Sequence, residues 1–173
     1  MREKDEGPAL NPTHGPRVLG IDPGLRTTGY SVLEKVGRGT KLCEAGVLTA
    51  AAKGDLAERV RQLFDGLVQV LEEWSPTAMA MEQLYAHYAH PRTAILMGHA
   101  RGAFLLAAAQ RNVPVISYAS TKVKRLVTGS GRAGKPQVQH AVARELGLTT
   151  LPEPHDVADA LAVALCHLYT LKT

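Results

Sequence analysis

Three strand-like runs joined by tight turns limit the fold of this chain more than any other feature. The runs cover residues 17–22, 28–36 and 40–50; a Pro-Gly turn follows the first, and the tripeptide Gly-Arg-Gly separates the second from the third. Short runs joined by glycine turns pair most readily with the run beside them in the sequence. The pattern therefore predicts an antiparallel meander at the start of the folded part.

Helical and strand-like segments alternate after this meander. Further strands are predicted over 77–84 and 113–118, and helices over 56–74, 91–111, 121–127, 136–146 and 154–171. Three hairpin-linked strands followed by two crossover units predict an α/β fold. Its core is expected to be a mixed five-stranded sheet, with three antiparallel and then two parallel strands, and with helices on both faces.

Two of the predicted helices carry apolar sides. In the helix over 91–111, one side holds Ile95, Leu96, His99, Gly102, Leu105 and Leu106. In the helix over 154–171, a side that we expect to pack on the sheet holds Val157, Ala160, Leu161, Ala164, Leu165 and Leu168. The spacing of three and four residues places each set on one face of its helix.

The length of 173 residues predicts one domain over 17–173, after a flexible extension over 1–16. The extension holds three prolines and two glycines and shows no hydrophobic period. Cys43 and Cys166 lack the spacing of metal ligands and lie among apolar residues, so we expect buried, reduced thiols in a cytoplasmic protein. No apolar run approaches the roughly 20 residues that span a membrane, and the charged N-terminus lacks the apolar segment of a secretory signal. We therefore expect no membrane partner.

Basic residues gather in one glycine-containing stretch. The chain has 20 lysines and arginines against 16 acids, a net charge of +4 that permits a polyanionic partner without requiring one. The stretch contains Lys122, Lys124, Arg125, Arg132 and Lys135. Such a cluster suits contact with the phosphates of a nucleic acid, although a solvated loop face would have the same composition.

Four carboxylates stand where solvated acids are not expected. Asp22 ends the first strand, Glu82 lies near the end of the strand over 77–84, and Asp156 and Asp159 share one face at the start of the last helix. If the first and fourth strands are neighbours, all four acids can converge. Oxygen ligands of this kind suit Mg²⁺ or Mn²⁺, and a pair of such ions can support phosphodiester hydrolysis.

Each acid also has a plainer explanation. Asp22 could belong only to its Asp-Pro-Gly turn, and Glu82 could sit at an exposed end of the sheet. Asp156 could interact only with the dipole of its helix. Asp159 is harder to explain in this way, because its neighbours on the helix are apolar. Together, the four positions favour a metal site.

Five segments of the chain read, in order, G-I-D-P-G-L-R-T-T-G-Y, A-M-E-Q-L-Y, G-H-A-R-G, K-P-Q-V-Q and H-D-V-A-D-A-L-A. Together they resemble the RuvC family of crossover junction endodeoxyribonucleases, the bacterial Holliday junction resolvases, and the similarity covers residues 17–171. The resemblance implies a ribonuclease-H-like fold and a homodimer. It also implies Mg²⁺-dependent hydrolysis, with two ions per subunit as the expected number, that nicks two symmetric strands of a four-way DNA junction.

The resemblance further implies roles for individual residues. It makes Asp22, Glu82, Asp156 and Asp159 the catalytic, metal-binding acids, and it places an aromatic that contacts junction bases at Tyr85. Lys124 and Lys135 match basic positions linked to DNA phosphates and catalysis, and Lys135 could stabilise charge on the phosphate in the transition state. The expected DNA-binding set is Tyr85, Lys122, Lys124, Arg125, Arg132 and Lys135. The family also implies a RuvA–RuvB branch-migration complex as a partner.

Two departures from the family pattern leave details open. Residues 86–91, A-H-Y-A-H-P, replace a loop that often carries Asn and Lys in relatives, so base contacts and sequence preference are not determined. Some relatives have a histidine at position 156; here His155 precedes Asp156, and we expect it to lie near the helix cap rather than to bind metal. His99 and His140 lie on predicted helices, and we expect both to be structural.

Two other functions fit parts of the pattern. An actin-like sugar kinase or ATPase also has a strand, an Asp-x-Gly turn and a second strand, and Thr27 and Thr28 would suit its phosphate loop. That site normally needs two domains, and the length here supplies one. A junction-binding protein without catalysis would not require all four acids.

Overall fold

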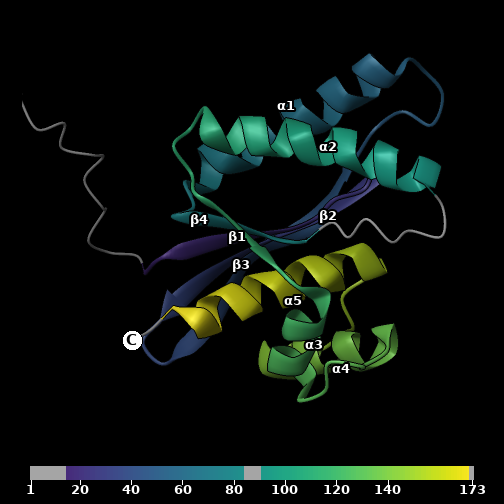
Figure 1. The fold of residues 1–173 in the computed structure, drawn as a ribbon. Coiled ribbons are helices and arrows are strands. Elements are labelled where there is room, and N and C mark those ends of the chain that lie inside the picture. The colour runs from purple at the N-terminus through teal and green to yellow at the C-terminus, as the bar shows by residue number, and fades with distance from the viewer. Residues whose placement is uncertain (1–14, 84–90, 172–173) are drawn as a thin grey trace, which may run out of the picture.

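The computed structural model describes residues 15–83 and 91–171, and a five-stranded sheet forms its centre (Figure 1). The strands are β1 (Arg17–Asp22), β2 (Thr27–Val36), β3 (Gly39–Thr49), β4 (Ala78–Glu82) and β5 (Val115–Tyr118), in the order β3-β2-β1-β4-β5. The β1–β2 and β2–β3 pairs are antiparallel, whereas the β1–β4 and β4–β5 pairs are parallel. The predicted mixed sheet is confirmed.

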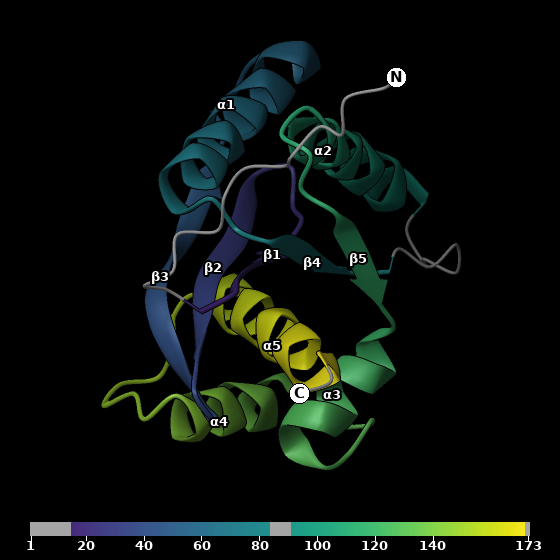
Figure 2. The ribbon, with the colours of Figure 1, turned by 90° about the vertical axis from the view of Figure 1, so that its left-hand side faces the viewer.

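Helices cover both faces of this sheet. Helices α1 (Leu56–Trp74) and α2 (Pro91–Ala109) lie on one face, and α5 (His155–Thr170) lies along the other (Figure 1, Figure 2). Helices α3 (Ser120–Thr128) and α4 (Lys135–Glu145) pack beside α5. Within the described residues, no helix combines the length and the apolar character that a membrane crossing needs.

Successive side chains of the central strands point to opposite faces of the sheet, and each face belongs to its own hydrophobic core. The side that faces α1 and α2 is fully buried and includes Leu19, Ile21, Met79 and Met81. Val18 and Ala80 pack on the opposite side with α5. Asp22 and Glu82 continue that second alternation, so their side chains leave the sheet on the α5 face.

Helix α5 approaches the sheet so closely that two strands need glycine beneath it. A Cβ atom on Gly20 would lie 2.1 Å from the carbonyl oxygen of Ala160, and one on Gly29 would lie 1.9 Å from that of Asp156. No larger residue fits at either position without moving the helix. The predicted packing face of α5 is confirmed as buried: Val157, Ala160, Leu161, Ala164, Leu165 and Leu168.

Helix α2 exposes most of the side that the sequence marks as apolar. Ile95, Leu105 and Leu106 are exposed to 62%, 40% and 54%. A Cβ atom added at Gly98 or Gly102 would meet nothing within 4 Å. The buried side, which packs with the core under α1 and α2, consists of Ala100, Phe104, Ala107 and Ala108. Much of the apolar side is therefore left without a partner among the residues that the structure describes.

The first described residues already form hydrogen bonds with strand β2. Gly15 donates its N–H to Glu34 Oε1 at 3.3 Å, and Lys35 donates its N–H to the carbonyl oxygen of Pro16 at 3.0 Å. Gly15 and Pro16, which precede the predicted domain boundary at 17, are thus in contact with the sheet.

The two cysteines lie in different surroundings. Both are free thiols; Cys166 of α5 is buried in the core, whereas Cys43 of β3 is only partly buried, beside the carboxylate of Glu34. The expectation of two buried thiols is therefore wrong for Cys43, because β3 is an edge strand with much of its length accessible.

Replacing Gly20 with alanine should destabilise the fold by about 1–3 kcal/mol, because the added methyl group would force α5 away from β1. Urea unfolding measures the change. The matched control is Gly39→Ala on β3, where the new Cβ has its nearest neighbour 3.6 Å away. The control should change the free energy of unfolding by less than about 0.5 kcal/mol. Equal stability of the two variants would contradict the close packing of α5.

Candidate active site

The ladder between β1 and β4 places Asp22 and Glu82 side by side. Ile21 pairs with Met81 in parallel register, so the next residue of each strand stands at the same level of the sheet. Both strands end at these acids. Two adjacent strand ends therefore present two carboxylates toward the start of α5.

The first turn of α5 supplies the other two acids. Gly29 is the ladder partner of Asp22, and the backbone of Asp156 passes directly over Gly29. Asp159 lies three residues further on the same side of the helix and remains partly accessible, although the residues on either side of it are buried. The structure thus brings the four acids singled out from the sequence to one end of the sheet.

Burial and repulsion make Asp22 hold a proton unusually well. Removal from water raises the pKa of Asp22 to about 8, and the negative charges of Asp159, Asp156 and Glu82 add to this shift. Lys135 opposes the rise in the pKa of Asp22 but does not cancel it. The cluster therefore carries more negative charge than its own lysine balances, which is the condition in which a bound cation is most stabilising.

Glu82 and Asp159 respond to the same surroundings. Burial raises the pKa of Glu82, as does the charge of Asp159, while a hydrogen bond with Ser120 and the charges of Lys124 and Lys135 lower it. Burial also raises the pKa of Asp159, and Lys135 is the largest influence that lowers it. Lys135 Nζ lies 3.8 Å from Asp159 Oδ2, yet 65% of the lysine side chain is exposed. Lys135 thus reaches the acids from the open side of the site.

The acids fit a hard metal ion by their chemistry. All four are oxygen donors, which Mg²⁺ and Mn²⁺ prefer, and a dication would relieve the repulsion around Asp22. In the part of the chain that the structure describes, however, no three carboxylate, imidazole or thiol groups stand in position to hold an ion together. Binding an ion would require the carboxylates to close in from these positions.

The predicted basic residues divide into two groups. Lys124 and Lys135 influence the acids directly, as the pKa shifts of Glu82 and Asp159 record. The remaining three, Lys122, Arg125 and Arg132, are exposed and show no salt bridge within the described ranges. Lys122 Nζ instead lies 5.0 Å from the ring centre of Tyr118.

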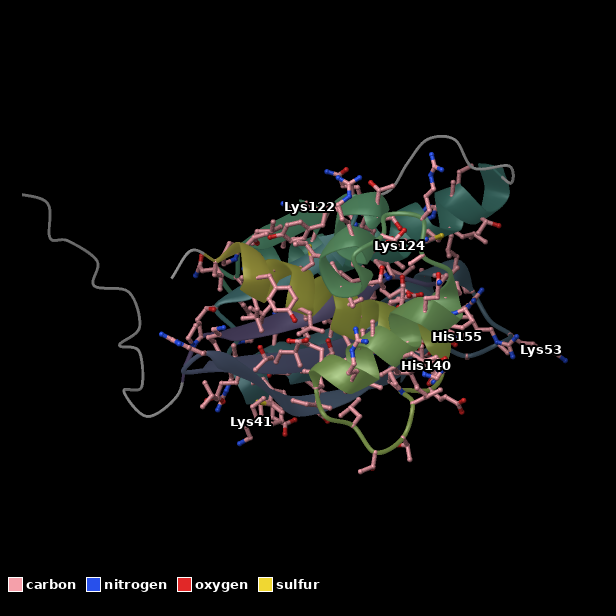
Figure 3. All side chains as sticks on the ribbon, turned by 90° about the horizontal axis from the view of Figure 1, so that it is seen from below. Lys41, Lys53, Lys122, Lys124, His140 and His155 are labelled. Carbon is pink, nitrogen blue, oxygen red and sulfur yellow. The ribbon has the colours of Figure 1, made fainter. Side chains whose placement is uncertain are left out.

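The face that carries these cations is visible in Figure 3. Lys122 and Lys124 extend from α3, and His140 and His155 lie on the same side of the molecule. His155 is the exposed first residue of α5 and lowers the pKa of Asp159, in keeping with the expected place near the helix cap. Tyr85 and residues 86–90 lie outside the described residues.

Sequence reasoning missed three features near the site. Ser120 forms a side-chain hydrogen bond with Glu82, and a serine placed directly after a strand and at the start of a helix was the available signal. His140, expected to be structural, is exposed and lines an open groove together with Arg144. Arg101 contacts the backbone of Glu82 from the opposite face of the sheet. His99, by contrast, is exposed and makes a contact within its own helix, to Ile95.

The groove runs between the segment after α3 and the outer side of α4. Its volume is about 570 Å³, and its lining combines hydroxyl, amide and cationic groups. The lining residues are Thr128, Ser130, Ala133, Pro136, Gln137, His140, Ala141 and Arg144. The groove continues the basic surface away from the acids.

Asp22 should make the metal-free protein less stable as the pH rises. Its ordinary pKa of 3.8 applies in the unfolded chain and its pKa of about 8 in the folded protein, so between these values only the folded state keeps the proton. The free energy of unfolding should therefore fall between about pH 4 and pH 8. Asp22→Asn should remove this contribution. Its free energy of unfolding should therefore exceed that of the wild type by roughly 1–4 kcal/mol at pH 7 in EDTA.

Urea unfolding of both proteins from acid to neutral pH measures this difference. Asp55→Asn, at an exposed acid before α1, is the control and should follow the wild-type curve. If the free energies of unfolding of Asp22→Asn and the wild type differed by the same amount from acid to neutral pH, the raised pKa of Asp22 would be contradicted.

Comparison with known proteins places this chain in a family. The family model "Crossover junction endodeoxyribonuclease RuvC" matches residues 18–167. A crossover junction endodeoxyribonuclease RuvC from Rhodopirellula baltica is 52% identical over 152 residues, which are 88% of this chain and 85% of that protein. One from Chloroflexus aggregans is 45% identical over 157 residues, which are 91% and 95% of the two chains.

Solved structures agree with these sequence matches. RuvC of T. thermophilus in complex with Holliday junction substrate superimposes with a TM-score of 0.84 at 35% identity, covering 89% of this chain and 93% of that one. The yeast mitochondrial Holliday junction resolvase Ydc2, at 19% identity and a TM-score of 0.61, shares the fold. The ribonuclease-H-like fold is confirmed, and the actin-like alternative finds no support. The chain belongs to the RuvC family of crossover junction endodeoxyribonucleases, a family of metal-dependent nucleases.

Proposed function

We propose that this protein resolves four-way DNA junctions by hydrolysing two symmetric strands. The observation that carries the proposal is the meeting of four carboxylates at the ends of β1 and β4 and the start of α5, beside the cations of α3 and α4. The Thermus thermophilus relative was solved with a Holliday junction substrate, and the similarity to it extends over most of this chain. The same substrate suits the acids and the basic surface found here.

The same proposal assigns Asp22, Glu82, Asp156 and Asp159 as ligands of Mg²⁺ or Mn²⁺, with two ions per subunit as the expected number. Asp22 stands between Glu82 on β4 and the two acids of α5, so it is suited to contact both ions. Bound ions of this kind activate a water molecule and stabilise charge on the leaving oxygen of a phosphodiester. The limited access of water around Asp22 strengthens its attraction to any cation.

Lys135 is the group that we assign to the phosphate. Its Nζ is close to Asp159 but its side chain remains mostly exposed, so an entering phosphate could take over the contact. The ammonium would then balance the charge that develops on the phosphate oxygens in the transition state. Lys124, which influences both Glu82 and Asp159, would approach the same phosphate group from α3.

The wider basic surface is proposed to hold the arms of the junction. Lys122, Arg125 and Arg132 are exposed around the loop between α3 and α4, and the groove adds His140 and Arg144. Contacts of this type release counterions and weaken as the salt concentration rises. Contact between Tyr85 and the junction bases belongs to the same proposal and rests on the family motif.

Two copies of the chain are proposed to pair through the outer side of α2. Ile95, Leu105 and Leu106 form an apolar side that no other described residue covers, and Gly98 and Gly102 leave the helix backbone open to close approach. A two-fold dimer would present two identical acid clusters to a junction with two-fold symmetry. Cooperation with a RuvA–RuvB branch-migration complex is part of this proposal and rests on family membership alone.

The reaction is tested with Mg²⁺, a mobile four-way junction and a linear duplex of the same sequence. We expect paired nicks in the junction, with 5′-phosphate and 3′-hydroxyl ends, and no cutting of the duplex. Asp22→Asn should lower the rate by more than about 100-fold, since loss of a ligand exceeds the usual effect of losing an outer-shell partner. It should still bind the junction, and Asp55→Asn should cut normally. Equal cutting of junction and duplex, or full activity of Asp22→Asn, would contradict the proposal.

The dimer is tested by placing a charge on the outer side of α2. Leu106→Glu should raise the dimer dissociation constant by at least about tenfold, because the carboxylate would have to be buried without a partner. Analytical ultracentrifugation measures this constant. Val36→Glu changes another exposed apolar residue, at the end of β2, and should leave the constant unchanged. Dimerisation of Leu106→Glu at the wild-type strength would place the interface elsewhere.

A further inference from the structure

Arg101 of α2 holds the end of β4 from the side of the sheet opposite the acids. Its Nη1 donates to the carbonyl oxygen of Glu82 at 2.6 Å, and its Nη2 donates to Ser117 Oγ of β5 at 2.6 Å. Hydrogen bonds from a charged donor are shorter and stronger than neutral ones. The guanidinium therefore fastens β4 to β5 at the level where β4 ends.

A partly buried guanidinium is a costly way to join two strands. Burial lowers the pKa of Arg101, which means that its charged form loses hydration. Among the described residues it forms no salt bridge, and its two hydrogen-bond partners are neutral oxygens. An apolar side chain could fill the same space without this cost. The arginine is therefore better explained by the two oxygen atoms to which it donates, on Glu82 and Ser117, than by a contribution to packing.

The peptide group that follows Glu82 is fixed at both of its polar atoms. Its carbonyl oxygen accepts from Arg101, and its N–H, which belongs to Gln83, donates to the carbonyl oxygen of Tyr118 at 2.8 Å. Glu82 itself lies one residue beyond the last β1–β4 pair, which joins Ile21 and Met81. Arg101 thus supports β4 at the point where its pairing with β1 has ended.

The orientation of this peptide determines where the Glu82 side chain points. That side chain leaves the sheet on the α5 face, where neighbouring negative charge, above all that of Asp159, repels its carboxylate. Repulsion would turn an unsupported strand end away from the other acids. A backbone held from the α2 side resists this movement without placing any group in the site.

We propose that Arg101 is a positioning residue for Glu82, which fixes the backbone of β4 so that the carboxylate meets the metal ion on the other face of the sheet. The inference rests on the proposed metal-binding role of Glu82. It adds a residue that takes no direct part in the hydrolysis. Partners that orient a metal ligand commonly change metal affinity or activity by about 10- to 100-fold when they are removed.

The test compares metal binding by variants in the full-length protein. Mn²⁺ is titrated without DNA and followed by electron paramagnetic resonance, and junction cleavage is measured as a function of Mg²⁺ concentration. Arg101→Met should weaken Mn²⁺ binding by about 10- to 100-fold and raise the Mg²⁺ requirement by a similar factor. Its junction affinity in EDTA should stay at the wild-type value. Arg101→Lys should be intermediate, because an ammonium cannot span both oxygens as the guanidinium does.

Two further variants separate positioning from general stability. Ser117→Ala removes one anchor of the guanidinium while keeping the arginine, and it should weaken Mn²⁺ binding in the same direction but less. Arg111→Met is the matched control, since Arg111 is also partly buried and donates to Glu72 at 2.6 Å without touching β4. It should lower thermal stability and leave Mn²⁺ binding unchanged.

Wild-type Mn²⁺ affinity in folded Arg101→Met, or an equal loss of affinity in Arg111→Met, would overturn the inference. If Arg101→Met does not fold, wild-type affinity in both Arg101→Lys and Ser117→Ala would overturn it as well. A folded wild-type protein that neither binds Mn²⁺ nor cuts the junction would instead overturn the proposed function. A wild type that cuts, with variants that match it in both measurements, would remove the role of Arg101 alone.

Discussion

The contact of α5 with the backbone of β1 and β2 determines the rest of this structure. Gly20 and Gly29 let the helix lie directly on the strands, and the same contact brings the first turn of α5 over the strand end that carries Asp22. Four carboxylates then share a poorly hydrated space, where repulsion costs more than it would in water. The apolar side of α5 is buried along its whole length, and the free energy of that burial offsets the repulsion. The packing of α5 on the sheet thus holds the four acids close together.

Much of this arrangement could be predicted from the sequence, because it depends on local patterns. The tight turns predict the meander, and the small and apolar face of α5 predicts a helix packed on the sheet. Acids at the ends of apolar runs mark Asp22 and Glu82 as candidates that converge if the first and fourth strands are neighbours, and the sheet order meets this condition. The buried side of α2 could not be predicted in the same way. This helix is apolar on more than one side. Its exposed isoleucine and leucines mark the outer side, while Phe104 and three alanines pack against the core.

The supporting contacts of the site were beyond sequence reasoning for a different reason. Ser120 and Arg101 are ordinary residues of their helices, and only the order of β4 and β5 in the sheet brings them to Glu82. Periodicity gives the side of a helix on which a residue lies, but it does not give the atom that the residue meets. The same limit applies to His140. The sequence predicts the helix on which it lies, but it does not tell whether the side chain packs in the core or lines a groove.

Strand β4 connects two surfaces that the proposals assign to different tasks. One face of the sheet carries the carboxylate of Glu82, and the other carries α2. The inner side of α2 holds Arg101, and its outer side has no partner in the ranges 15–83 and 91–171. A protein neighbour that orders α2 would therefore also steady the peptide on which Glu82 depends. Such an effect is reciprocal by thermodynamic linkage. The free energy by which a bound neighbour would favour metal binding equals the free energy by which bound metal would favour association with that neighbour. If two copies pair through α2 as proposed, a nuclease that must cut two strands of one junction would gain from this arrangement, because the paired state would also be the state that is ready to bind metal.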